Sequence, residues 1–214
     1  LGMVELTDRF EAKNTNLFLE KGRLVFKHRK VYLPTYGVFE EKRYFTPGNR
    51  FRAFNSVNGR FGMLICEDFW HASPPYLLWL DGADVLLLTS ASPGRGLDTG
   101  EILSSARWVE LVNKAYASLF TTFVVHANRA GYEDGLNFWG GSTIFDPKGH
   151  LVVKGPYHQE DLVVSSIDLN QLHRTRSRLP LLRDERTDRD GQQGQAELGA
   201  GRAEFGFDRG DGRD

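Results

Sequence analysis

Short runs of apolar residues alternate with polar turns over most of the chain, and their spacing predicts its secondary structure. Apolar residues recur every three or four positions over residues 101–120, which predicts a long helix. A shorter helix is predicted over residues 75–80. Residues 17–19 and 23–26 flank a Lys-Gly pair at 21–22, which predicts a β-hairpin turning there. Further strands are predicted at residues 61–66, 84–89, 122–127, 141–145, 151–154 and 162–167.

The order of these elements predicts an α/β domain over residues 1–186. Strands and helices alternate and are then followed by consecutive strands, which favours a mixed sheet with helices packed on it. Residues 187–214 have a different composition, with seven glycines and eleven charged residues. Such a segment has too little apolar surface to offset its ordering entropy, so we expect a disordered tail.

Composition narrows the range of functions. The 214 residues include 27 lysines and arginines against 28 acidic residues, a net charge of -1, which argues against a nucleic-acid-binding surface. The apolar runs are too short to cross a membrane. The single cysteine excludes an intrachain disulfide and fits a reducing compartment, so we expect a cytoplasmic protein. No signal or transit peptide pattern is visible.

Cys66 is the first candidate for catalysis. An apolar strand ends at this residue and Glu67-Asp68 follow at once. In open α/β sheets, chemistry gathers beyond such strand ends, where the next backbone N–H is free to stabilise an oxyanion. The alternative is a buried structural cysteine, the commoner fate of a lone Cys in a strand. Two carboxylates directly after the thiol argue against a strand that continues into the core.

A long irregular stretch over residues 28–48 supplies further candidates. It is dense in aromatic residues, glycine and proline, and loops of this length inside a compact domain are often functional. Lys30 and Glu41 bring an ammonium and a carboxylate that one site would use together. Taken alone, Lys30 is more often a solvated strand charge than a site residue. A third stretch, residues 127–142, combines a polar turn with a glycine pair beside aromatic residues.

Neither a metal site nor a phosphate-binding loop is predicted. The six histidines are scattered and show no ligand spacing, and residues 93–96 match neither the P-loop nor the dinucleotide pattern. His71 lies five residues after Cys66, but this separation along a turn does not establish that the imidazole reaches the sulfur. We therefore expect chemistry without a metal or an organic cofactor.

Residues 28–48, 62–93 and 127–149 together resemble the lysine, nucleophile and following regions of the nitrilase (carbon–nitrogen hydrolase) superfamily, in its amidase-like branch. The resemblance extends from about residue 4 to residue 186. It implies a four-layer α-β-β-α sandwich and hydrolysis of an amide or N-carbamoyl compound through a cysteine acyl-enzyme. It also implies a small-molecule substrate and a homodimer or larger homo-oligomer, without nucleic acid or membrane.

The resemblance also assigns roles to individual residues. Cys66 would be the nucleophile, Lys30 and the backbone N–H of Glu67 would hold the oxyanion, and Glu41 would orient the lysine. The remaining residues that the resemblance assigns would shape the acyl pocket: Tyr36, Phe39, Trp70 and Glu133.

The family's general-base glutamate is the part of the pattern that does not map. In the family it lies well upstream of the lysine region, whereas Glu5 and Glu11 are too close to Lys30. We therefore expect this chain to lack an N-terminal strand–helix portion and, with it, the base. Residues 187–214 also differ from the leucine- and arginine-rich helix of relatives.

Two other functions stay open. The segment LPTYGVFEEKRYF at residues 33–45 is close to the glutaminase half of a glutamine-dependent NAD synthetase. A nitrilase-like binding protein without turnover would suit loss of the base. The presence of Lys30, Glu41 and Cys66 together favours a catalytic parent protein.

Overall fold

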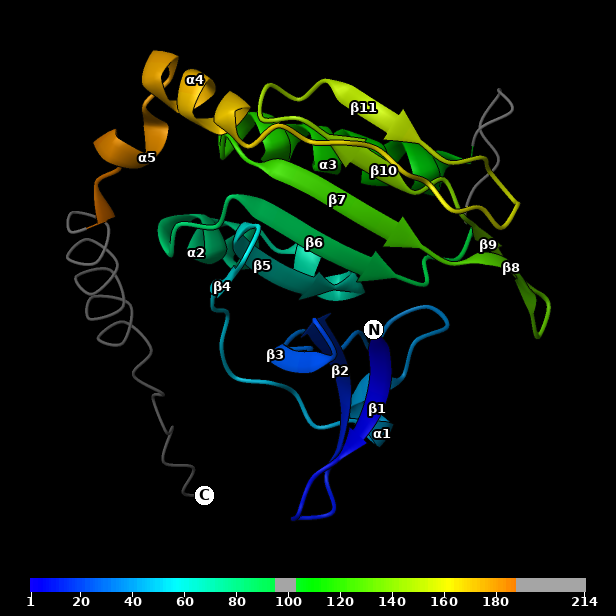
Figure 1. Ribbon diagram of the computed structural model, residues 1–214. Helices are drawn as coiled ribbons and strands as arrows, with labels where there is room; N and C mark the ends of the chain where they lie inside the picture. Colours follow the sequence, from blue (N-terminus) through cyan, green and yellow to red (C-terminus); the bar gives the residue numbers. More distant parts are fainter. Residues whose placement is uncertain (95–102, 188–214) are drawn as a thin grey trace, which may run out of the picture. The chain divides into compact units, whose positions relative to one another are not determined.

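A six-stranded mixed sheet forms the centre of the fold (Figure 1). The computed structural model describes residues 1–94 and 103–187. The three central strands are parallel and the outer ones antiparallel, which confirms the mixed sheet expected from the sequence. The strand order is β11 (Leu151–Lys154), β10 (Thr143–Phe145), β7 (Phe123–Asn128), β6 (Val85–Ser90), β5 (Gly59–Ile65) and β4 (Phe54–Ser56).

The N-terminal strands β1 (Gly2–Leu6), β2 (Ala12–Glu20) and β3 (Arg23–Arg29) form a separate antiparallel sheet. The turn between β2 and β3 has positive φ angles of 49° at Lys21 and 73° at Gly22. Two consecutive positive φ angles give the backbone twist that tight hairpins favour. The predicted hairpin is therefore confirmed, with strands longer than the apolar runs suggested.

Helices α2 (Ser73–Leu80) and α3 (Ser104–Leu119) pack on one face of the six-stranded sheet (Figure 1). Gly62 of β5 makes this packing possible, since a Cβ there would lie 2.7 Å from Leu78 Cδ1. Both helices were predicted, although the predicted start of the longer one, residues 101–102, lies outside the described residues. Their shared core contains Leu64, Phe69, Leu78, Leu86, Leu88, Ala117 and Val124.

The opposite face of the six-stranded sheet is covered by two different elements. Val85 and Phe123 pack against Leu172 of α4 (Asn170–Arg178). Phe18 and Phe26 of the N-terminal sheet contact Phe54 and Phe61, with ring centroids 4.3–5.4 Å apart. These aromatic contacts hold β2 and β3 against β4 and β5, and so bring the segment that follows β3 close to the end of β5.

The predicted strand over residues 162–167 is wrong. The structure leaves this segment outside every β-ladder, and Leu162 and Val164 are 84% and 76% exposed. Ile167 packs against the cluster of Val85, Phe123 and Leu172, and Val163 lies against Gly155. Residue type alone favoured a strand here, but whether such residues form a strand depends on their surroundings in the fold.

The sequence pattern also missed several short elements. They are β1, β4, the ribbon of β8 (Ala130–Glu133) and β9 (Leu136–Trp139), α1 (Glu41–Tyr44), α4 and α5 (Leu181–Asp184). The predicted disordered tail lies almost entirely outside the described residues. No helix of the described residues is long and apolar enough to cross a membrane.

Buried His126 on β7 gives the fold a pH-dependent stability. Its Nε2 lies 2.7 Å from Ser90 Oγ, and its Nδ1 lies 3.3 Å from the amide nitrogen of Asn113. The Asn113 amide can only donate, so Nδ1 accepts and the imidazole is neutral. Burial lowers the pKa of His126 to about 3.

We expect the free energy of unfolding to fall as the pH drops from about 6.5 towards 3, by up to about 1.4 kcal/mol per pH unit. In this range the unfolded chain binds a proton at His126 that the folded chain does not bind. Denaturant unfolding at several pH values should show that the free energy of unfolding depends less steeply on pH in His126→Gln than in the wild type. His173, which is exposed on α4, provides the matched control His173→Gln. An equal slope in the wild type and in His126→Gln would contradict the assignment.

Candidate active site

Cys66 lies where β5 ends and the 3-10 turn η1 (Cys66–Trp70) begins, as the sequence predicts. Its φ of 44° is in the left-handed region, which costs a residue with a side chain about 1–2 kcal/mol. The side chain is partly exposed and lines a cavity. An inert core cysteine has neither property, so the location fits a reactive thiol better than a structural one.

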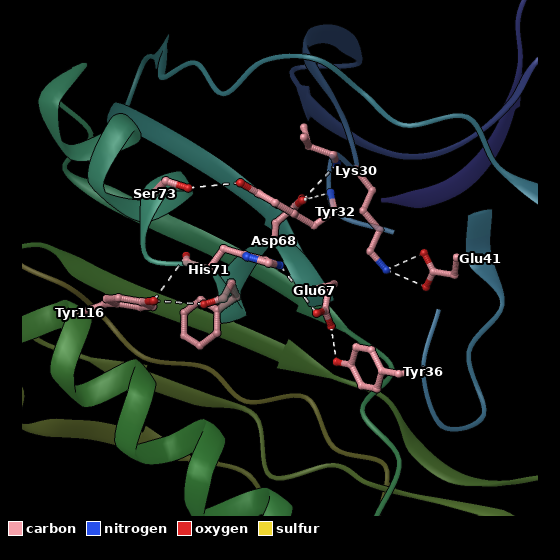
Figure 2. Close-up of polar contacts among 11 residues, drawn as sticks. Lys30, Tyr32, Tyr36, Glu41, Glu67, Asp68, His71, Ser73 and Tyr116 are labelled. Carbon is pink, nitrogen blue, oxygen red and sulfur yellow. Dashed lines mark hydrogen bonds and ion pairs between the residues drawn. The ribbon is translucent and has the colours of Figure 1, made fainter. Parts of the chain in front are cut away.

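Helix α3 holds the turn that follows Cys66 in place. Tyr116 donates its hydroxyl to the carbonyl oxygens of Phe69 and His71, at 3.2 and 3.5 Å (Figure 2). The rings of Phe69 and Tyr116 also meet edge to face, with centroids 5.0 Å apart. These contacts fix the turn that carries the thiol to the helical layer of the fold.

Lys30 and Glu41 form a close ion pair, which Figure 2 shows in the loop after β3. Lys30 Nζ lies 2.6 and 2.7 Å from the two carboxylate oxygens of Glu41. Lys30 is only 1% exposed, so the interpretation as a solvated strand charge is wrong. A buried ammonium held by one carboxylate is a fixed positive charge in a low-dielectric setting.

The electrostatic environment of Cys66 comes from burial and four charged side chains. Burial raises the pKa of the Cys66 thiol, and the Lys30 ammonium acts in the opposite direction. The carboxylates of Glu41, Glu67 and Asp68 raise the pKa again, so the net direction is upward. A group that removes the thiol proton is therefore needed before the sulfur becomes a strong nucleophile.

A cavity of about 100 Å³ opens beside Cys66. Three of the predicted pocket residues, Tyr36, Phe39 and Trp70, line it. Its remaining wall includes residues that the sequence analysis did not single out: Ser92, Pro93, Ser105 and Val109. Ser105 and Val109 come from α3, and only the helical spacing of that segment hinted at their inward face.

The Glu67 carboxylate belongs to the wall of this cavity. It is 9% exposed and accepts a hydrogen bond from the Tyr36 hydroxyl at 2.7 Å (Figure 2). Its other oxygen lies 3.8 Å from His71 Nε2. His71 itself stacks on the ring of Tyr32, with centroids 3.6 Å apart. The cavity thus pairs an acidic group with aromatic side chains.

Glu133 lies on β8, away from the residues that line the cavity. It is exposed and bound to Arg129 at 2.5 Å. The sequence analysis named Asp68 only as a carboxylate after the thiol and assigned it no role in the site, although it has no exposed surface. Among the described residues, no group of three histidine, cysteine or acidic side chains is arranged to hold a metal ion.

Comparison with known proteins identifies the family of this chain. Residues 2–177 match the carbon-nitrogen hydrolase family. The chain belongs to that family. The match covers the loop with Lys30, the turn with Cys66 and the cavity wall as far as the structure describes it. The resemblance to the nitrilase superfamily read from the sequence is therefore confirmed.

The curated relatives fall into two groups. The chain is 30% identical over 170 residues to the glutamine-dependent NAD(+) synthetase of Acinetobacter baylyi, covering 79% of this chain but 30% of that protein. It is also 30% identical over 197 residues to the mouse omega-amidase NIT2, covering 87% of this chain and 67% of the relative. The chain thus spans less than a third of the synthetase relative.

Solved structures share the fold of this carbon–nitrogen hydrolase. The carbon-nitrogen hydrolase of Helicobacter pylori G27 superposes with a TM-score of 0.80 at 27% identity, over 87% of this chain and 67% of that one. The glutamine-dependent NAD+ synthetase of Acinetobacter baumannii superposes with a TM-score of 0.68 at 28% identity, over 75% of this chain and 29% of that one.

Proposed function

We propose that this domain hydrolyses a small amide through a covalent acyl-enzyme on Cys66. The buried Lys30–Glu41 pair, which acts on a partly exposed thiol at a strained strand end, is the observation that carries the proposal. Lys30 supplies a fixed positive charge, and Cys66 supplies the only thiol of the chain. A positive charge held ready beside a nucleophile stabilises the negative charge that develops in acyl transfer.

The reaction would proceed in two steps. The Cys66 thiolate attacks the amide carbon, and the oxygen of the tetrahedral intermediate is held by Lys30 Nζ and the Glu67 backbone N–H. The carbon–nitrogen bond then breaks, and the leaving nitrogen takes up the proton that the base removed from the thiol and departs as ammonia. Water attacks the remaining thioester, the carbon–sulfur bond breaks, and the carboxylic acid and the free thiol are released.

The general base must be a group other than the three carboxylates near Cys66. Glu41 is bound to Lys30, Glu67 to Tyr36, and Asp68 to backbone N–H groups. We therefore propose that a fourth carboxylate serves as base, as the resemblance to the family implies. General-base assistance contributes about 10²–10⁴-fold, so residues 1–214 alone should turn over slowly if that carboxylate lies elsewhere.

The acidic wall of the cavity favours a substrate with a hydrogen-bond-donating or cationic group. Glu67 is nearly buried and directly follows Cys66, and its carboxylate contacts the Tyr36 hydroxyl at 2.7 Å and His71 Nε2 at 3.8 Å. An ammonium on the substrate would offset the cost of that buried charge. This observation supports the second candidate function, the glutaminase of a glutamine-dependent NAD synthetase, because L-glutamine carries an α-ammonium group.

Acyl transfer to hydroxylamine at alkaline pH tests both candidates, because the thiol then ionises without a general base and hydroxylamine attacks the thioester without one. We expect the chain to form hydroxamates from small amides. L-glutamine should react faster than N-acetyl-L-glutamine, and Glu67→Gln should reduce that preference. Equal rates for the two would favour a general amidase without ammonium recognition. No hydroxamate from any amide or N-carbamoyl compound would contradict the catalytic proposal and favour a binding protein.

A further inference from the structure

Asp68 is a buried carboxylate that the proposed reaction does not use. It has no exposed surface and lies in the turn η1, two residues after the nucleophile. Its Oδ1 accepts the backbone N–H groups of Val31 and Tyr32 at 3.0 and 2.9 Å (Figure 2). These are the two residues directly after Lys30. One oxygen of Asp68 therefore holds the chain segment that delivers the ammonium.

The second oxygen of Asp68 holds the other half of the site. Oδ2 accepts the backbone N–H of Ile65 at 3.1 Å, the residue directly before Cys66. His28 Nε2 lies 2.9 Å from the same oxygen, and His28 is 3% exposed. His28 belongs to β3, two residues before Lys30. The Asp68 carboxylate thus accepts hydrogen bonds from residues on both sides of Lys30 and from β5, which ends just before Cys66.

We propose that Asp68 is a positioning residue that holds the segment after Lys30 against the turn that begins at Cys66. His28 orients the Asp68 carboxylate. The effect of this positioning on catalysis rests on the proposed function. A buried carboxylate is costly, and here each of its bonds goes to a backbone or ring donor of an element that carries a reacting group. Removing it would leave three backbone N–H groups without their acceptor, the one of Ile65 buried and those of Val31 and Tyr32 partly buried. The bond to Ile65 also supports the left-handed backbone at Cys66.

Alkylation of Cys66 by iodoacetamide as a function of pH tests this role without any amide turnover. The chain has one cysteine, so the reaction reports on Cys66 alone. In Asp68→Asn, the amide nitrogen cannot accept the bonds from Ile65 and His28. The Asp68 charge by itself raises the pKa of the Cys66 thiol, whereas the Lys30 ammonium lowers it. Loss of charge alone would therefore move the alkylation profile to lower pH, and loss of Lys30 positioning would move it to higher pH.

We expect Asp68→Asn to shift the alkylation profile to higher pH and to reduce kcat for acyl transfer by about 10–100-fold, with KM changed less than about threefold. Asp146→Asn is the matched control. Asp146 is 7% exposed and accepts the backbone N–H groups of Lys148 and His150 at 2.8 and 2.9 Å, far from the cavity lining. The Asp146→Asn variant should be less stable than the wild type but show the same alkylation profile.

The double variant Lys30→Met with Asp68→Asn separates positioning from charge. If Asp68 acts through Lys30, adding Asp68→Asn to Lys30→Met should leave only the charge effect, a shift to lower pH. A profile of Asp68→Asn that is unchanged or moves to lower pH in the presence of Lys30 would overturn the inference. If the wild type forms no hydroxamate, the proposed function fails, while the alkylation profiles still decide the role of Asp68.

Two less disruptive variants at His28 test the inference if Asp68→Asn does not fold. His28→Ala removes one donor and leaves the carboxylate in place, whereas His28→Gln keeps an amide N–H at a similar distance from the backbone. We expect His28→Ala to shift the alkylation profile to higher pH and His28→Gln to restore most of the wild-type profile. An unshifted profile in His28→Ala, or a shift in His28→Gln as large as in His28→Ala, would overturn the orienting role.

Discussion

Replacing Cys66 by alanine is expected to reduce acyl transfer by at least about 10³-fold, because no covalent intermediate can form. The remaining residues would bind the amide and polarise its carbonyl, but hydroxylamine or water would have to attack the amide directly. Hydroxamate formation measures the loss of rate. Mass spectrometry of wild-type protein incubated with the amide should find the acyl adduct on the peptide that contains Cys66.

A second residue in a strained conformation provides the control for Cys66→Ala. Thr121 is buried, has a φ of 46°, and lies just before β7 at the end opposite the cavity. Thr121→Ala should therefore keep the wild-type rate, which separates loss of the nucleophile from the effect of shortening a side chain at a positive φ. Cys66→Ala protein with undiminished hydroxamate formation would contradict the proposed mechanism.

Replacing Lys30 by methionine is expected to lower the acyl-transfer rate by about 10²–10³-fold, the size of effect seen when an oxyanion donor is removed. Methionine keeps the length and apolar stem of the side chain and removes the charge. The loss of the ammonium should also shift alkylation of Cys66 to higher pH, because Lys30 lowers the pKa of the thiol. Both effects should appear in the same protein sample.

Lys13 supplies the matched control for Lys30→Met. It is also buried, at 8% exposed, and pairs with Glu11 at 3.4 Å, but it does not belong to the cavity wall. Lys13→Met should keep the wild-type rate. Lys30→Met leaves the Glu41 carboxylate without its partner, so the double variant with Glu41→Gln is also needed. A double variant that recovers the wild-type rate would show that the ammonium does not take part in the reaction.

The sequence predicted the site well where the signal is local. An apolar run that ends in Cys66 and two carboxylates placed the thiol at the end of β5, and the structure confirms that position. The pairing of Lys30 with Glu41 was proposed from one loop and the family resemblance, and the ion pair is present. The predicted central strands also form the sheet, because continuous apolar runs are typical of buried parallel strands.

Features that depend on distant partners have no local signal along the chain. Asp68 receives donors from residues 36–40 positions earlier, so its role depends on the packing of two sheets. The cavity wall uses α3, which is far along the chain from Tyr36. Residues 162–167 were predicted as a strand from residue type, yet they pair with no described strand. Glu133 was placed in the pocket from its position after the nucleophile region, although it is exposed on β8.

The parallel arrangement of β5, β6 and β7 determines when the thiol acquires its surroundings during synthesis. Each parallel pairing requires the whole crossover between its strands, so β5 cannot pair with β6 until about residue 90, nor β6 with β7 until residue 128. Part of the cavity wall beside Cys66 comes from α3, which is made between those two points. A nascent chain therefore carries an uncovered thiol for dozens of residues of translation, and Cys66 becomes protected only once α3 has docked on the sheet.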